Sequence, residues 1–361
     1  MNPTPSSSEP TTLRLPPGWS ARAPELDDLE RLCQLRSVVR EAITGWVSVD
    51  RDAVVAELAG PKSWTRRQAV AVDPSGVIRA WASAHDRAAG RAVVDLDLDR
   101  SVPEADQVAA IGYTWLEEQG IAFAAQRGLA RTQLDAGPRA DDAEQRRWLA
   151  AAGYEHVRTW LHMSRPVTPD EAEPGVLPEP RPGVTVRRVD THESGLPVAK
   201  DLQTVHRVLE AAFEDHFNSY RESFPEFLTR LRVEPGHRWD HWWLAFMDDP
   251  DHPEAPPVAA GALVGSELPA GASGKAGTYV EYLGADRRSR GRGVATALLF
   301  AVVRDAAARG RDRVDLEVDA DSPTGAQTLY ENWGWRTDHV TESWHKDVEV
   351  HKDVEVTDGT V

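Results

Sequence analysis

The sequence predicts an α/β fold of mixed α+β character, in which two similar domains follow each other along the chain. Six prolines lie within residues 166–182, a density that a packed element does not tolerate, and this segment divides the 361 residues nearly in half. The same order of strands and helices recurs on both sides of it. In the second half, an apolar strand leads through a Gly/Arg-rich turn into a helix without a breaker. We therefore expect two domains, each with a mixed central sheet flanked by helices.

The expected boundaries follow from changes in composition. Residues at the N-terminus are rich in Pro, Ser and Thr, and near the C-terminus the segment 345–350 is repeated as 351–356. The five expected segments are a disordered tail (1–17), a first domain (18–165), a Pro-rich linker (166–182), a second domain (183–350) and a C-terminal tail (351–361).

The expected elements correspond between the halves. The first half should contain a strand at Trp19–Arg22, helices at Leu26–Val39 and Glu104–Arg127, a strand at Arg131–Asp135 and a last helix that ends before Gly153. The second should contain a strand at Val184–Arg187, helices at Val198–Phe213 and Gly293–Arg309, a strand at Arg313–Val318 and a last helix before Gly334. We expect a loop at His237–Trp243 before a strand at Leu244–Phe246, and a final strand ending near Val350.

Composition excludes several classes of function. A net charge of −17 argues against nucleic acid or an anionic membrane as a partner and weakly favours a cationic substrate. Cys33 is the single cysteine, so no disulfide can form within the chain, and a reducing compartment is plausible. We find no secretory signal and no apolar stretch of about 18 residues, and we expect a cytoplasmic protein.

The segment Arg290-Gly291-Arg292-Gly293-Val294-Ala295 carries the clearest functional signal. Two glycines let backbone N–H groups approach a ligand, and the helix that follows adds its own N–H groups and the positive end of its dipole. Arg287 and Arg288 lie on the same turn. The dinucleotide fingerprint does not match because Ala297 stands where a third glycine is needed, and no P-loop Lys-Ser/Thr follows. The turn predicts a pyrophosphate site.

A second motif lies downstream, where a short helix in Asp321–Trp335 ends in Tyr330-x-x-x-Gly334-Trp335. Together the two motifs resemble the GCN5-related N-acetyltransferase (GNAT) superfamily, whose Gln/Arg-x-x-Gly-x-Gly/Ala signature holds the pyrophosphate of acetyl-CoA. The two-domain arrangement is similar to tandem members such as mycothiol synthase. The resemblance covers the second half strongly and the first half weakly.

The resemblance implies acetyl-CoA as co-substrate and no metal. The residues that would bind it are the turn (Arg290, Gly291, Arg292, Gly293, Val294, Ala295), an arginine for a phosphate (Arg288 or Arg292), the strand before the turn for the pantetheine arm (Leu283, Gly284, Ala285), and two hydroxyls that replace the family's Asn (Ser322, Thr324).

An amine acceptor needs a base, because freeing the lone pair of an alkylammonium at pH 7 costs on the order of 4 kcal/mol. Glu281 precedes the turn on the strand where family members often place such a carboxylate, and Tyr330 matches the family tyrosine that protonates the departing sulfur. The alternatives are a solvent-facing glutamate, since strand parity can be off by one, and an aromatic core residue.

Residues for the acceptor are predicted less sharply. Asp215 and His216 end the first helix of the second domain and could bind an amine, and Trp239 could pack over it. A metal site at His237 and His241 is disfavoured, because both are expected in a loop and no third ligand is evident.

The first domain lacks a phosphate turn. Its corresponding segment contains Asp99, Glu104 and Asp106, whose carboxylates would repel phosphates. The sequence therefore predicts an acetyl-CoA-dependent N-acetyltransferase, a monomer or homodimer that acts on a small-molecule amine from one site in the second domain. The alternatives are a non-catalytic acyl-CoA sensor or scaffold, a protein N-acetyltransferase, and a bifunctional enzyme with a hidden activity in the first domain.

Overall fold

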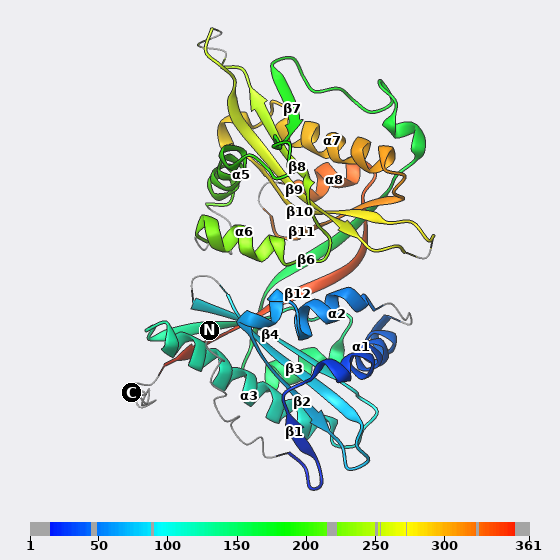
Figure 1. Cartoon of the computed structure of the whole chain (residues 1–361), viewed down its shortest axis with the longest axis vertical. Helices are drawn as coiled ribbons and strands as arrows, with labels where there is room; N and C mark the ends of the chain where they lie inside the picture. The colour runs from blue at the N-terminus through cyan, green and yellow to red at the C-terminus, as the bar shows by residue number, and fades with distance from the viewer. Residues whose placement is uncertain are drawn as a thin grey trace. The chain divides into compact units, whose positions relative to one another are not determined.

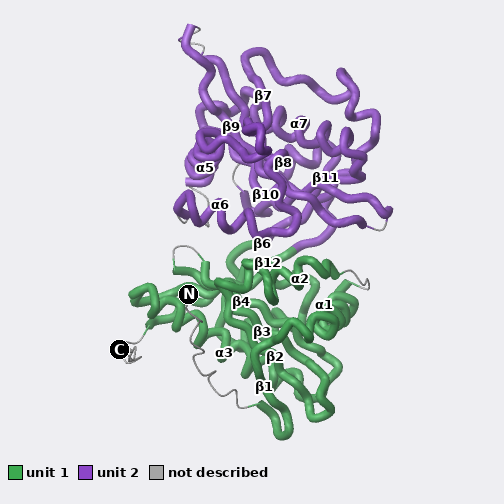
Figure 2. Tube along the Cα trace, viewed as in Figure 1, with its two compact units in different colours: residues 1–158, 341–361 green, residues 159–340 purple. Residues whose placement is uncertain are grey.

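The computed structural model describes residues 15–44, 49–87, 90–214, 222–249, 252, 254–271, 273–322 and 325–350. The chain forms two compact units, shown in Figure 2. The first unit contains residues 1–158 and 341–361, and the second contains residues 159–340. Within the described ranges, no helix has the length and apolar character needed to cross a membrane.

The sheet of the first unit is mixed, as the sequence predicts. Its strands run in the order β1-β2-β3-β4-β5-β12, with a parallel ladder between β4 and β5 and antiparallel ladders elsewhere. The strands are β1 (Ser20–Arg22), β2 (Arg66–Val72), β3 (Ile78–Asp86), β4 (Arg91–Leu98), β5 (Arg131–Ala136) and β12 (Arg336–Glu349).

Helices cover both faces of this sheet (Figure 1). The helices are α1 (Leu29–Thr44), α2 (Arg51–Leu58), α3 (Ala105–Gln126) and α4 (Ala143–Ala151). Leu116 of α3 packs with Leu96 and Leu134 on one face, whereas Leu32 of α1 packs with Trp81 on the other. Because successive strand residues point to opposite faces, the two apolar clusters fix the register of the strands.

The sheet of the second unit repeats this design. Its strands run in the order β6-β11-β10-β9-β8-β7, and β10 pairs with β11 in parallel while the other described ladders are antiparallel. The strands are β6 (Glu155–Pro166), β7 (Val184–Arg188), β8 (His237–Met247), β9 (Val258–Leu268), β10 (Gly277–Ala285) and β11 (Arg313–Asp319).

Four helices of the second unit are described: α5 (Ala199–Ala212), α6 (Phe224–Arg232), α7 (Val294–Ala308) and α8 (Ala326–Asn332). Helix α7 buries Leu298 and Val302 against one face of the sheet, and α5 and α6 cover the other face. The contact with α7 is close at Gly261, where an added Cβ would lie 2.6 Å from Val294 Cγ1. A glycine is required there because any side chain would push α7 away from the sheet.

The division of the chain differs from the expected boundaries at 165 and 183. Residues 160–166 of β6 pair with β11 and so complete the sheet of the second unit. Residues 344–349 of β12 pair with β5 and complete the sheet of the first. Each half of the sequence therefore contributes its last strand to the other half's sheet, a long-range pairing that no local pattern indicates.

The Pro-rich segment 166–182 is not the unpacked linker that the sequence suggested. It contains a 3₁₀ turn at Pro169–Ala172, and Val167 and Leu177 are buried in the core that contains α7. The first proline of the turn occupies its N-terminus, where the missing N–H group costs nothing. The prolines therefore shape a segment that packs along the second unit.

The expected loop at His237–Trp243 is also wrong, because β8 begins at His237. Trp242 packs on the α5/α6 face and Trp243 on the α7 face, and both are nearly inaccessible to solvent. A strand buried on both faces lacks the polar alternation that identifies a half-buried strand, and the histidines hide its apolar character.

His237 makes the second unit sensitive to acid. Burial, followed by the charges of Arg232 and Arg238, lowers the pKa of His237 to about 4. The folded pKa lies below the unfolded one of about 6.5, so this stability is fully present above pH 6.5 and is lost towards pH 4. His237→Phe keeps the ring contact with Trp239 at 4.3 Å and should reduce the loss between pH 7 and 4.5 by on the order of 2 kcal/mol.

Urea unfolding at the two pH values measures this difference. The control is His252→Phe, which makes the same substitution at a histidine whose side chain is 75% exposed. An equal loss of stability in the His237→Phe protein and the unchanged protein would contradict the assignment.

Candidate functional site

The site is built around the point where β10 and β11 part. Their parallel ladder covers Thr278 to Val280, whereas β10 continues to Ala285. The pairing of β10 with β9 shifts register between Val280 and Tyr282, which makes a β-bulge at Glu281. Bulges re-aim side chains and occur often beside functional sites. Beyond the bulge, Leu283, Gly284 and Ala285 pair with β9, the three residues predicted to offer backbone to a pantetheine arm.

The predicted phosphate turn connects β10 to α7. Gly291 and Gly293 adopt φ angles of +73° and +84°, in the left-handed region that favours glycine. Among the described residues, we find no hydrogen-bond partner for the N–H groups of five residues of the turn and of the first turn of α7, namely Gly291, Gly293, Val294, Ala295 and Thr296. These donors lie at the positive end of the α7 dipole, an arrangement suited to a phosphate.

The turn is held rigidly by contacts beneath it. The buried Ser289 hydroxyl donates to the carbonyl of Asp286 at 2.6 Å, and the N–H of Asp286 donates to the carbonyl of Ala260 on β9. Helix α5 packs closely on the strand before the turn, since a Cβ on Gly284 would lie 2.9 Å from Leu209 and from Ala212. The donors are therefore positioned before any ligand arrives.

The arginines of the turn differ in their surroundings. Arg288 is 82% exposed, and its guanidinium donates to the carboxylate of Asp286 at 2.8 Å, so it is already engaged within the turn. The backbone N–H groups of Arg290 and Arg292 donate within the turn, to the carbonyls of Arg287 and Ser289, whereas no side-chain hydrogen bond or ion pair of either arginine is found among the described residues. The sequence analysis missed Arg181, which comes from the Pro-rich segment and donates from Nη1 to the carbonyl of Gly291 at 2.6 Å.

Arg181 also lies over the second glycine, because a Cβ on Gly293 would be 3.0 Å from its Cδ. We expect Arg181→Ala to raise the Kd for acetyl-CoA about tenfold, because it removes a cation beside the turn and the hydrogen bond that supports the carbonyl of Gly291. The control is Arg304→Ala, which removes a hydrogen bond from α7 to Glu179 of the same Pro-rich segment. Arg304 lies about 15 Å along α7 from the phosphate turn. Equal affinities for the two variants in calorimetry would exclude Arg181 from the site.

Glu281 lies on the face of the sheet that α5 and α6 cover. Its Oε1 accepts a hydrogen bond from the hydroxyl of Ser266 at 2.7 Å, and its side chain is half-buried. Ser266 pairs with Tyr279 across the sheet, and paired residues point to the same face. Glu281, which is bonded to Ser266, therefore shares that face with both residues. The carboxylate is thus held by a side chain on the neighbouring strand.

Tyr330 lies on the opposite face. It is 8% exposed, packs in the core cluster that contains α7 and Leu316, and its ring centroid is 6.1 Å from that of Trp335. Burial raises the pKa of Tyr330 to about 12, so its hydroxyl stays protonated at neutral pH. Glu281 and Tyr330 therefore belong to opposite sides of the sheet.

Of the remaining predicted site residues, the structure describes only Ser322 and Trp239. Ser322 lies in the loop after β11, and its N–H donates to the carbonyl of Asp319. Trp239 is half-buried among aromatic rings, with Trp242 at 5.3 Å. Thr324, Asp215 and His216 lie outside the described residues.

No group of three or more His, Cys, Asp or Glu side chains that could hold a metal ion occurs in the described ranges. His241 is fully buried and its Nδ1 lies 2.7 Å from Asp240 Oδ1. Burial, followed by the charge of Arg311, lowers the pKa of His241. This surrounding is that of a packed core histidine.

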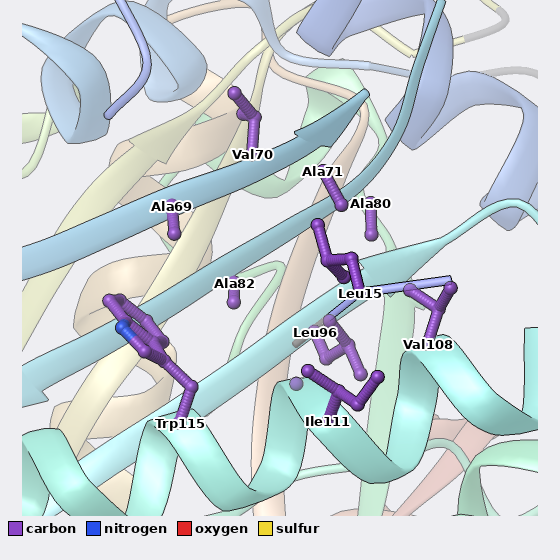
Figure 3. A pocket seen from close by; sticks show the side chains of 11 residues that line it. Leu15, Ala69, Val70, Ala71, Ala80, Ala82, Leu96, Val108, Ile111 and Trp115 are labelled. Carbon is purple, nitrogen blue, oxygen red and sulfur yellow. The ribbon is translucent and has the colours of Figure 1, made fainter. Parts of the chain in front are cut away.

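In the first unit, side chains of the chain itself occupy the corresponding turn. Asp99 accepts from the N–H and hydroxyl of Ser101, and Asp106 accepts from Trp148 Nε1 at 2.8 Å. A pocket between the sheet and α3, shown in Figure 3, is lined by apolar residues such as Leu15, Leu96 and Trp115. The carboxylates at the first place would repel a pyrophosphate, and the lining of the second is apolar.

Part of the second unit matches a known protein family. A family model described as the Acetyltransferase (GNAT) family matches residues 206–335, which contain the turn, Glu281 and Tyr330. A GCN5-related N-acetyltransferase from Sphaerobacter thermophilus has a TM-score of 0.68 at 24% identity, covering 93% of this chain and 97% of that one. No curated protein sequence matches the chain.

Two further solved structures are similar over most of the chain. A tandem GNAT protein from the clavulanic acid biosynthesis pathway has a TM-score of 0.61 at 14% identity, with coverages of 91% and 98%. N-myristoyltransferase of Saccharomyces cerevisiae with bound myristoyl-CoA has a TM-score of 0.55 at 12% identity, with coverages of 94% and 80%. These likenesses confirm the fold of two tandem GNAT-like domains, and the family model confirms the resemblance to the GNAT superfamily over residues 206–335.

Proposed function

We propose, from the GNAT fold of the chain and the family match of its second unit, that this unit is an acetyl-CoA-dependent N-acetyltransferase with a small-molecule amine as acceptor. The observation that carries the proposal is the turn from Arg290 to Ala295, in which the N–H groups of Gly291, Gly293, Val294 and Ala295 have no hydrogen-bond partner among the described residues. It lies next to the point where the β10–β11 ladder ends. A diphosphate at the turn would thus direct an attached arm towards Glu281.

Each residue would have a separate task in direct attack by the amine. Bound acetyl-CoA would supply the thioester, and the N–H groups of the turn would hold its pyrophosphate. Glu281 would take the proton of the acceptor ammonium, which overcomes a cost on the order of 4 kcal/mol at pH 7. Tyr330 would donate its hydroxyl proton to the departing sulfur, for which a raised pKa keeps the proton in place.

The first unit would bind no acyl-CoA in this proposal. Its turn is occupied by Asp99 and Asp106 with partners of their own. Carboxylates at that position would also repel phosphate oxygens. The first unit would then serve as a structural partner, because β12 supplies one of its strands from the end of the second half.

Isothermal calorimetry with acetyl-CoA tests the proposal. We expect one site per chain, followed by release of free CoA thiol when a panel of primary amines is added. Two sites would overturn the assignment of the first unit. Absence of acetyl-CoA binding would refute the acyltransferase proposal. Binding without turnover of any amine would favour a non-catalytic acyl-CoA sensor.

A further inference from the structure

A band of polar side chains crosses the α5/α6 face of the second unit beside the end of the β10–β11 ladder. The strand registers align four residues across the sheet, Ser266 of β9, Tyr279 of β10, Asp315 of β11 and Ser164 of β6. Residues paired in this way point to the same face. The hydroxyl of Ser164 donates to Asp315 at 2.6 Å, which confirms that the band continues on to β6.

Two glutamates occupy the next position along this face. Glu281 follows Val280 on β10 and Glu317 follows Leu316 on β11, and Val280–Leu316 is the last pair of the parallel ladder. The two carboxylates therefore lie on either side of the point where the strands part. This is the point towards which a ligand anchored at the phosphate turn would extend.

Each glutamate is held from its outer side by a neighbouring strand. On β9, Ser266 donates to Glu281 at 2.7 Å. On β6, Nε2 of His162 lies 2.7 Å from Oε2 of Glu317. The ring of His162 is stacked on that of His339 at 4.1 Å, with 11° between the ring planes, which restricts its orientation.

The contact between His162 and Glu317 could have a purely structural role, as a surface ion pair that stabilises the fold by about 0–1 kcal/mol. That explanation does not account for the excess of negative charge beside the pair. Burial, Glu317 and Glu281 all raise the pKa of Tyr279, so both carboxylates act on the same point. Burial also raises the pKa of Asp315. Nε of Arg313 lies 3.2 Å from Oδ2 of Asp315 and offsets the charge of that carboxylate, so a further cation would be held by Glu281 and Glu317.

We propose that Glu281 and Glu317 together bind the acceptor as an alkylammonium, and that His162 is a positioning residue that holds Glu317 in place. The inference rests on the proposed function and names its substrate class, a primary aliphatic amine that enters charged. One N–H bond of the ammonium breaks, the proton passes to a glutamate, and the nitrogen lone pair becomes available for attack on the thioester. The second carboxylate keeps the site favourable to the next cation.

Two CoA thioethers test this without knowledge of the acceptor. S-(2-aminoethyl)-CoA places an ammonium close to the site of attack, and S-propyl-CoA replaces that ammonium by a methyl group. In calorimetry at pH 7, we expect the full chain to bind the ammonium compound at least tenfold more tightly. Glu317→Gln and Glu281→Gln should each remove most of that preference, while S-propyl-CoA binds as before.

His162→Gln should remove part of the preference at unchanged affinity for S-propyl-CoA, a result that a general loss of structure would not give. Glu179→Gln, which removes an exposed carboxylate of the same unit, should leave the preference intact. Equal affinities of the unchanged protein for the two thioethers, or a preference for the ammonium compound that survives Glu317→Gln, would overturn this inference. The proposal that the protein binds acyl-CoA would be unaffected. If neither thioether binds, the proposed function fails together with this inference.

Discussion

Replacing both Gly291 and Gly293 by glutamate should abolish acetyl-CoA binding, with at least a 100-fold rise in Kd. Both glycines have positive φ, so each substitution costs on the order of 1 kcal/mol of backbone strain. The larger effect is electrostatic. Two unit charges 5 Å apart repel by about 3 kcal/mol at an effective dielectric constant of 20, and each carboxylate would face a pyrophosphate. Calorimetric titration with acetyl-CoA measures the loss directly.

The other end of α7 provides a matched control. Gly310 also has a positive φ, +70°, and a Cβ there would meet no atom within 4 Å, as at Gly291. Gly310→Glu therefore introduces the strain and the charge of one such substitution, as at Gly291, about 25 Å from the turn. It should lower stability slightly and leave acetyl-CoA affinity within about twofold. Full affinity in the double variant would show that the diphosphate binds elsewhere.

The phosphate turn could be predicted from the sequence because its determinants are local. Two glycines, the arginines and an uninterrupted helix all lie between Arg287 and Ala308, and the structure places α7 within one residue of the expected span. The short helix with Tyr330 is local in the same sense. Its glycine, Gly334, has a positive φ, as does Gly153 at the corresponding place in the first unit.

Residues that reach the site through long-range pairing could not be predicted. His162 belongs to the first half of the sequence and comes to Glu317 only because β6 pairs with a strand about 150 residues later. Arg181 lies in a segment whose prolines suggested a linker. The face to which Glu281 points was uncertain for a different reason, since the bulge after Val280 interrupts the alternation on which parity depends.

Tyr330→Phe should lower kcat/KM by about 10²–10⁴ while acetyl-CoA binds with unchanged affinity. The substitution keeps the buried ring and its contact with Trp335 and removes only the hydroxyl that would protonate the departing sulfur. Because burial raises the pKa of Tyr330 to about 12, the hydroxyl is protonated at every pH below about 11. Its titration should therefore cause no loss of activity between pH 6 and 10.

Tyr113 of the first unit supplies the control for the loss of a buried hydroxyl. It is 2% exposed, and Tyr113→Phe makes the same chemical change in a core without the phosphate turn. That variant should keep full turnover and similar stability. If Tyr330→Phe also kept full turnover of a tested amine, Tyr330 would be a packing residue, and the proton for the sulfur would have to come from water or from the acceptor. A loss confined to Tyr330→Phe, with acetyl-CoA still bound, separates proton donation from both folding and cofactor binding.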